Sequence, residues 1–143
     1  MSDTILIIDD ESAIRESLAG ILADEGFVPL TAASAEEGLQ LLDERDINLL
    51  LLDIWMPGMD GLEALKLIKQ RFSFPVIMIS GHGTIETAVQ ATRSGAFDFI
   101  EKPLSYDKTI LSIKKGLQVA QLERENQLLR ENGPPPVTIT GNS

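Results

Sequence analysis

The sequence predicts an α/β protein in which a parallel β-sheet is covered by helices on both faces. Five short apolar runs alternate with five stretches whose apolar residues recur at helical spacing. Three of these runs, ILII, LLLL and VIMI, are apolar at every position. Continuous apolar runs are typical of strands buried on both faces, and strands that alternate with helices favour a parallel sheet.

Local signals define the first two strand–helix units. We expect a strand at residues 4–8 and then a helix that ends at Gly26, because glycine readily adopts the conformation that terminates helices. The second strand, 27–31, contains Pro29, and a proline inside a strand favours a position at the sheet edge. The second helix begins at the capping box 34–37, where a serine and a glutamate satisfy free backbone N–H groups.

Proline and glycine bound the remaining elements. We expect strands at 48–52, 76–80 and 97–100, helices at 62–72 and 84–94, and a long last helix from about Ser105. In the fourth helix, apolar residues from Ile85 to Val89 define one side. Gly116 interrupts the last helix, and we expect that it lets the helix bend.

Right-handed crossovers between parallel strands leave few possible topologies. We predict a flavodoxin-like (βα)5 doubly wound parallel sheet with strand order 2-1-3-4-5 and an extended C-terminal helix. This order puts the second strand, which contains Pro29, at an edge. In such a sheet, ligands bind beyond the carboxyl ends of strands 1 and 3, where the strand order reverses.

Acidic residues end both of these strands. Asp9 and Asp10 follow the first strand, and Asp53 follows the LLLL run of the third. Carboxylates that lie together repel one another, so a cation is expected to compensate for them. The cluster offers oxygen ligands, and the chain has no cysteine and one histidine. We therefore expect Mg²⁺ or Mn²⁺ here rather than zinc.

Ser80 and Lys102 add a hydroxyl and an ammonium at the ends of the fourth and fifth strands. Together with a divalent cation and a carboxylate, these groups are typical of phosphoryl transfer, since they neutralise the charge of the transferred group. The carboxylate itself can be the nucleophile. A single strand-end aspartate more often forms a cap or a turn, but that explanation does not account for polar groups at four strand ends.

Composition limits the classes of function. The net charge of −10 disfavours nucleic-acid binding by this chain alone. The N-terminal segment is acidic where a signal peptide needs positive charge, and the apolar runs are too short to span a bilayer. The absence of cysteine agrees with a reducing compartment. We expect a cytoplasmic protein without membrane contact.

Four segments, IIDDES, LLLLDIWMPGMDG, VIMISGHG and AFDFIEKPL, resemble in order and spacing the receiver domain of bacterial two-component response regulators. The resemblance covers about residues 3–120. SGHGTIETAV and GAFDFIEKP are similar to the NtrC/NtrX-like subfamily of sigma-54-dependent activators. The implied function is a phosphorylation-activated switch, with no enzymatic activity beyond phosphorylation and dephosphorylation of its own aspartate.

The resemblance implies a role for each site residue. Asp53 would accept a phosphoryl group from a sensor histidine kinase. Mg²⁺ would be held by Asp9, Asp10 and Asp53 together with the backbone carbonyl of Trp55. Trp55 and His82 would stand at positions that affect how fast the acyl phosphate is hydrolysed, and the bulky side chain of Trp55 would shield it from water. The alternative is that both are exposed loop side chains.

The resemblance also implies a switch. Lys102 would bind a phosphate oxygen, and the Lys102–Pro103 peptide would be cis. Ser80 would turn toward the phosphoryl group and Phe99 would turn in behind it, changing the surface formed by the fourth helix, fifth strand and fifth helix. The alternative for Phe99 is ordinary core packing.

The chain is expected to have three parts: a receiver domain at 1–120, a helical linker at 121–132, and at 133–143 a proline-rich linker with the start of a missing ATPase domain. Apolar residues and one asparagine recur at a and d positions of a heptad, at Val119, Leu122, Asn126 and Leu129. This spacing favours a parallel coiled coil and a homodimer, and the alternative is a frayed, solvated helix. Contacts with DNA and sigma-54 polymerase would need the missing domains.

Two other functions fit parts of the pattern. A haloacid-dehalogenase-type phosphatase also uses a strand-end aspartate, Mg²⁺ and lysine, but its nucleophile lies on the first strand in an Asp-x-Asp pattern, whereas this chain has Asp9-Asp10 there. A phosphorylation-independent interaction module would keep the fold without the chemistry. The complete set of acids, Ser80 and Lys102 argues against the second alternative.

Overall fold

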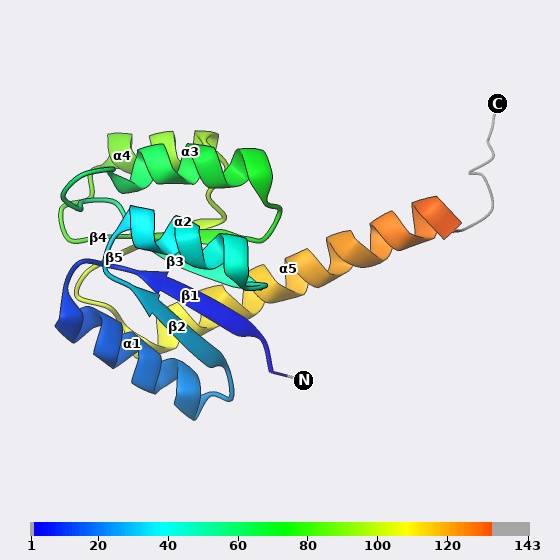
Figure 1. Ribbon diagram of the computed structural model, residues 1–143, viewed down its shortest axis with the longest axis horizontal. Helices are drawn as coiled ribbons and strands as arrows, with labels where there is room; N and C mark the ends of the chain where they lie inside the picture. Colours follow the sequence, from blue (N-terminus) through cyan, green and yellow to red (C-terminus); the bar gives the residue numbers. More distant parts are fainter. Residues whose placement is uncertain (1, 133–143) are drawn as a thin grey trace.

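The computed structural model describes residues 2–132, with side chains up to Leu129. Five strands alternate with five helices (Figure 1). In chain order they are β1 Thr4–Ile8, α1 Ser12–Asp24, β2 Val28–Ala32, α2 Ala35–Glu44, β3 Leu49–Asp53, α3 Gly61–Arg71, β4 Val76–Ser80, α4 Ile85–Arg93, β5 Asp98–Glu101 and α5 Tyr106–Asn132.

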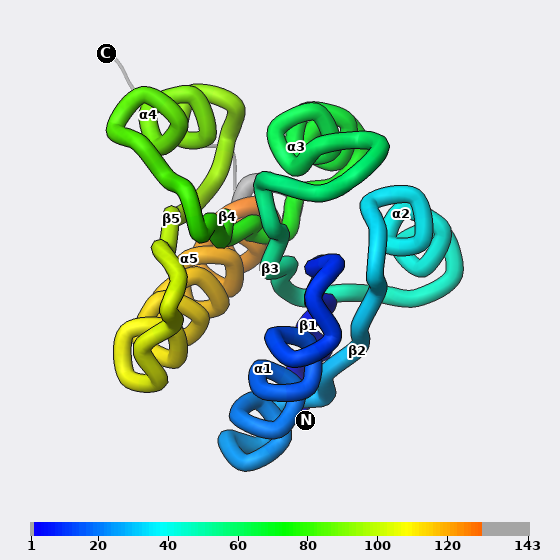
Figure 2. The backbone as a smooth tube through the Cα atoms, turned by 90° about the vertical axis from the view of Figure 1, so that its left-hand side faces the viewer, coloured from blue at the N-terminus to red at the C-terminus, as the bar shows by residue number. Residues whose placement is uncertain are grey.

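The strands form one parallel sheet in the order β2-β1-β3-β4-β5, which confirms the predicted topology. The strand that contains Pro29 lies at an edge, where the missing N–H costs no ladder hydrogen bond. Helices α2, α3 and α4 cover one face of the sheet, and α1 and α5 cover the other (Figure 2).

The apolar strands supply the core on both faces. In β1 and β3, alternate side chains point to opposite sides, so each strand contributes to two clusters. Leu6, Ile8, Leu50 and Leu52 pack beneath α2 and α3, whereas Ile5, Ile7, Leu49 and Leu51 pack against α1 and α5. All eight are fully buried, and burial of each stabilises the fold by roughly 1.5–3 kcal/mol. The strand ends that carry the acids therefore continue from the fully buried core.

Three strands begin and end one residue later than the sequence predicts: β2, β3 and β5. The shift matters in β3, because Asp53 is itself a member of the strand and pairs in register with Ile79 of β4. Its backbone is thus fixed by the sheet and not by the loop that follows.

The capping box of α2 forms with a shifted partner. Ser34 Oγ accepts a hydrogen bond from the Glu37 N–H at 3.1 Å, as predicted. The Glu37 carboxylate accepts from the N–H of Ala33, at 2.7 Å, and not from the N–H of Ser34 itself. Two free backbone donors are satisfied in either arrangement.

Helix α4 packs through its small residues. The apolar side that the sequence suggests is turned to the solvent, since 86% of Ile85 and 42% of Val89 is exposed, whereas Ala91 is fully buried. The helix covers the edge of the sheet above β5, a strand of four residues. An apolar strip therefore remains on the surface of α4.

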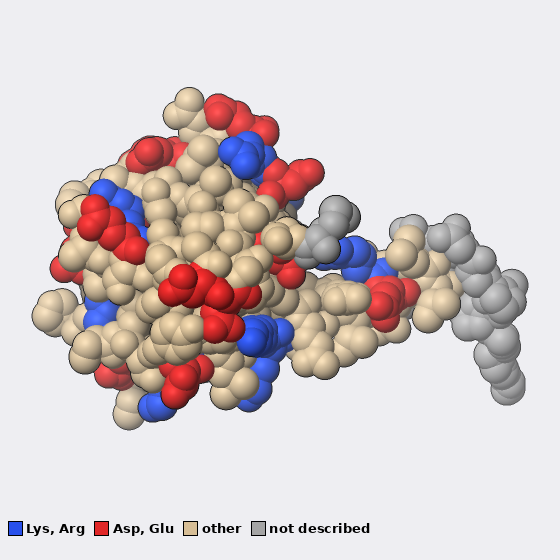
Figure 3. Space-filling model, turned by 90° about the horizontal axis from the view of Figure 1, so that it is seen from below, with Lys and Arg blue, Asp and Glu red and all other residues tan. Residues whose placement is uncertain are grey.

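Helix α5 runs unbroken through Gly116, so the expected interruption is wrong. Gly116 is buried, and a Cβ there would lie 3.1 Å from Leu49 Cδ1 and 3.4 Å from Phe97 Cδ2. The glycine lets α5 approach β3 closely. Beyond it the helix projects from the domain (Figures 1 and 3), while acidic side chains are spread over the domain surface in Figure 3. Within residues 2–132, no helix is long and apolar enough to cross a membrane.

Candidate functional site at the carboxyl ends of β1 and β3

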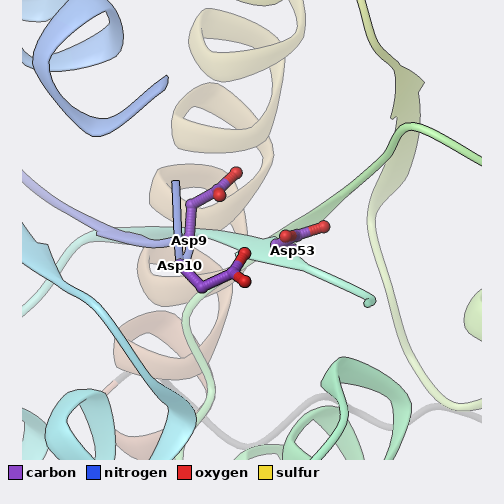
Figure 4. A group of neighbouring side chains, drawn as sticks. All are labelled: Asp9, Asp10 and Asp53. Carbon is purple, nitrogen blue, oxygen red and sulfur yellow. The ribbon is translucent and has the colours of Figure 1, made fainter. Parts of the chain in front are cut away.

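Three aspartates converge where the strand order reverses (Figure 4). Asp9 and Asp10 follow β1, and Asp53 is the last residue of the neighbouring β3. Asp9 and Asp53 are buried and Asp10 is exposed, with one carboxylate oxygen of each within 4.8 Å of the others. The structure thus brings together all three acids that the sequence singles out.

Backbone contacts fix the two buried acids. The Asp9 N–H donates to the Ala32 carbonyl at 3.1 Å, and the Asp9 carboxylate accepts from the Glu11 N–H at 2.9 Å. Next to Asp53, the Gly61 N–H donates to the Ile54 carbonyl at 2.7 Å. A Cβ at Gly61 would overlap the carbonyl oxygen of Asp53. The first turn of α3 therefore lies directly against the end of β3.

Lys102 reaches across the site from the loop after β5. Its Nζ lies 3.0 Å from Asp9 Oδ2, 3.6 Å from Asp53 Oδ2 and 2.7 Å from Glu11 Oε2. Its backbone N–H donates to the Ser80 carbonyl at 2.8 Å, and the Lys102–Pro103 peptide is cis, as the resemblance implies. Sequence reasoning missed Glu11, although it directly follows the Asp9-Asp10 pair.

Burial and neighbouring groups shift the pKa values of Asp53, Lys102 and Glu11. Burial, and then the charge of Asp9, raise the pKa of Asp53 from 3.8 to about 7, although Lys102 and a backbone hydrogen bond from Trp55 oppose this. Burial also disfavours the charged form of Lys102, but hydrogen bonds to Glu11 and Asp9 outweigh it and raise the lysine pKa. The hydrogen bond from Lys102 lowers the pKa of Glu11. The raised pKa of Asp53 indicates that the site lacks positive charge.

A hard divalent cation fits this charge deficit. Asp9 Oδ2 is buried, and among the described residues it accepts no hydrogen bond of good geometry, contacting Lys102 as an ion pair. One carboxylate oxygen of each aspartate lies within 4.8 Å of the other two, and carboxylate oxygens are ligands that Mg²⁺ prefers. Asp9, Asp10 and Asp53 could therefore hold such an ion, with carboxylate oxygens as ligands.

The comparisons with known proteins agree with this geometry. Residues 5–114 match the family described as response regulator receiver domain. The chain belongs to this family. It is 47% identical over 142 residues to an NtrX-like response regulator of Rickettsia bellii, an alignment that covers 97% of this chain and 30% of the relative. The chain thus spans about a third of the curated relatives it matches.

Solved structures of receivers extend the likeness. NtrX from Brucella abortus is 45% identical and superposes with a TM-score of 0.87 over 100% of this chain and 32% of that chain. The beryllofluoride-activated NtrC4 receiver domain dimer is 38% identical, with a TM-score of 0.79 over 82% of this chain and 98% of that chain. The chain is a receiver of the NtrX/NtrC type.

In this receiver, Ser80 is the last residue of β4 and Phe99 lies within β5, two residues before the residue that pairs with Ser80. Ser80 is fully buried, and its Oγ accepts a hydrogen bond from the His82 N–H at 3.1 Å. The half-buried ring of Phe99 lies over Gly83, where a Cβ would approach Phe99 Cζ to 2.7 Å. Phe99 also packs against the core cluster beneath α4. The hydroxyl is thus engaged by its own loop, and the aromatic ring rests against that same loop.

Trp55 and His82 belong to the loops of the receiver that follow β3 and β4. Half of Trp55 is exposed, and His82 is exposed. Their exposure agrees with both interpretations of these residues. Two hollows of about 580 and 610 Å³ lie along α5, and the three aspartates line neither of them.

Proposed function

We propose that this receiver is a phosphorylation-activated switch in which Asp53 accepts a phosphoryl group from a sensor histidine kinase. The observation that carries the proposal is the buried Asp53 carboxylate at the end of β3, with Lys102 at 3.6 Å and two further aspartates beside it. A nucleophile, a fixed cation and a metal-binding cluster within one crevice are what phosphoryl transfer needs.

In the transfer step, a carboxylate oxygen of Asp53 forms a bond to phosphorus as the bond from phosphorus to the donor breaks. From a histidine donor, the P–N bond electrons return to the ring nitrogen, which regains its lone pair. From an acyl phosphate, the donor leaves as a carboxylate. Lys102 neutralises part of the charge on the equatorial oxygens, and the Ser80 hydroxyl donates to one of them after leaving the His82 N–H.

Asp9, Asp10 and Asp53 would hold Mg²⁺, or Mn²⁺, with the Trp55 carbonyl as a further ligand. When bound, the ion supplies positive charge at the phosphoryl oxygens and lowers the pKa of Asp53, which keeps the nucleophile ionised. Trp55 and His82 flank the site in the loops and would modulate hydrolysis of the acyl phosphate.

The readout would be the surface formed by α4, β5 and α5. Ile85 and Val89 on α4, with Phe97 beside β5 and Leu111 on α5, are exposed apolar residues on these elements. A movement of Ser80 would free the loop against which Phe99 rests, and the ring would turn inward. The NtrC4 receiver named above forms a dimer when activated by beryllofluoride, which supports a dimeric readout here.

The wider context follows from the relatives. We propose a cytoplasmic response regulator whose receiver controls sigma-54-dependent transcription through an ATPase and a DNA-binding domain beyond this chain. The receiver would comprise residues 1–120 and the helical linker 121–132. The remainder, 133–143, lies outside the described residues. Exposed Val119, Leu122, Asn126 and Leu129 on α5 would pair two copies as a coiled coil.

The test is intact-mass spectrometry of the chain after incubation with acetyl phosphate and Mg²⁺. We expect one phosphoryl adduct in the wild type and none in Asp53→Asn. The matched control is Asp46→Asn, which makes the same substitution at an exposed loop position. It should form the adduct at the wild-type rate.

Two outcomes would contradict the proposal. A folded wild type that forms no adduct with donor and metal present would favour an interaction module. Repeated turnover of a phosphate ester by the wild type would favour a haloacid-dehalogenase-type phosphatase.

A further inference from the structure

Glu11 occupies the N-cap position of α1 but does not cap the helix. Its backbone is extended, with φ −89° and ψ 116°, and its side chain makes no capping hydrogen bond. Instead the carboxylate accepts a hydrogen bond at 2.7 Å from Lys102, 91 residues away. Glutamate is not among the preferred N-cap residues. The observed partner of the Glu11 carboxylate is therefore Lys102 and not the helix that follows.

The distances show how Lys102 is shared. Its Nζ is within hydrogen-bonding distance of Glu11 and of Asp9, and at 3.6 Å it lies beyond that distance from Asp53. The ammonium donates a hydrogen bond to Glu11, whereas its contact with Asp9 is an ion pair without good hydrogen-bond geometry. The group that would neutralise a phosphoryl oxygen is thus held mainly by a carboxylate that the proposed chemistry does not use.

We propose that Glu11 is a positioning residue that competes with the phosphoryl group for Lys102. It binds the ammonium while Asp53 is unmodified and yields it when the phosphoryl group arrives. This inference rests on the proposed function of Asp53. Because Glu11 is an anion beside the site, it opposes an incoming phosphate in two ways: by direct repulsion and by occupying Lys102.

Removal of the Glu11 charge should therefore favour binding of the anionic phosphoryl donor. The Glu11 side chain is 58% exposed, so the pair is partly screened by water. We expect Glu11→Gln to lower the KM for acetyl phosphate about two- to fivefold, the range that corresponds to an exposed ion pair. The maximal rate should change less, because Asp9 still contacts Lys102.

The experiment measures the rate of adduct formation by intact mass at several acetyl phosphate concentrations, with Mg²⁺, at low and high salt. Glu16→Gln is the matched control, since Glu16 is exposed on the same helix and makes no ion pair within the described residues. It removes the same charge and should leave KM unchanged. High salt should shrink the effect of Glu11→Gln, and Glu11→Asp should restore KM toward the wild-type value.

Several results would overturn this role. An equal KM in Glu11→Gln and wild type would show that Glu11 does not compete, and a raised KM would show that it supports Lys102 instead. An effect of Glu11→Gln that is the same at all salt concentrations would indicate a change of structure and not of charge. If the wild type itself forms no adduct, the proposed function fails as well, whereas an adduct with unchanged KM removes only the role of Glu11.

Discussion

At Asp53, burial and the charge of Asp9 disfavour the ionised carboxylate. Its pKa is raised from 3.8 to about 7, so the ionised form costs the folded state free energy at neutral pH. Because the folded state binds the proton more tightly, stability falls as the pH rises from about 4 to 7. The proposed phosphoacceptor is thus a source of instability that a bound cation would relieve.

Asp53→Asn is therefore expected to stabilise the fold without a divalent ion. At pH 8 we expect a gain on the order of 2 kcal/mol, since each pKa unit corresponds to about 1.36 kcal/mol and Lys102 loses one of its anionic neighbours. The gain should fade as the pH falls from 7 to 4, where Asp53 carries a proton. Thermal unfolding followed by circular dichroism over this pH range measures it.

The same melts with Mg²⁺ supply the control. The ion should raise the Tm of the wild type and have a smaller effect on Asp53→Asn, which has lost a ligand. A variant that is less stable than the wild type at pH 8 would contradict a buried, disfavoured charge.

At the scale of elements, the contact between α3 and β3 leaves no room for an added side chain. Gly61→Ala would drive a Cβ into the Asp53 carbonyl and should cost about 2–4 kcal/mol. Gly20→Ala is the matched control, because Gly20 lies inside α1 with no atom within 4 Å of a Cβ there. It should stabilise the fold by about 0.5–1 kcal/mol. Urea unfolding of both variants measures the difference, and equal effects would contradict the close contact.

The sequence predicts a structural feature well when nearby residues in the chain determine that feature, and poorly when distant residues do. The strand order and the edge position of Pro29 followed from apolar runs and one backbone restriction, and the meeting of Asp9, Asp10 and Asp53 followed from that order. The partnership of Glu11 with Lys102 could not be predicted, because it joins side chains 91 residues apart whose rotamers the chain order does not determine.

Two helices show the same limit. The apolar side of α4 predicts burial, but Ile85 is exposed because the helix packs through alanines over a short edge strand. In α5, a glycine inside a helix ordinarily predicts a weak point in the helix. At Gly116 the glycine instead accommodates the close approach of Leu49 and Phe97. In both helices tertiary packing determines which residues are buried, and the local sequence pattern carries no information about that packing.

At the scale of the whole molecule, the projecting part of α5 offers the stripe formed by Val119, Leu122, Asn126 and Leu129 for pairing. We expect the double variant Leu122→Glu and Leu129→Glu to weaken a dimer at least about tenfold, because each buried leucine contributes roughly 1.5–3 kcal/mol. At concentrations where the receiver is monomeric, its Tm should not change, since both side chains are exposed. Sedimentation equilibrium at several concentrations measures the association.

Leu128→Glu is the control for this prediction. Leu128 is equally exposed, but it lies off the stripe, at a c position of the heptad. If it weakened association as much as the double variant, the a/d pairing would be wrong.

Gly116 packs closely against β3, so the number of residues that follow it in α5 determines how the rest of the helix is rotated relative to the domain. Since the helix is unbroken from the domain to Asn132, every residue between Gly116 and Val119 sets a rotation of about 100° and an advance of about 1.5 Å. One inserted residue would rotate the Val119–Leu129 stripe away from its present direction about the helix axis. Four inserted residues would bring it nearly back to that direction. The number of helical residues after Gly116 therefore sets the direction in which the linker faces relative to the receiver.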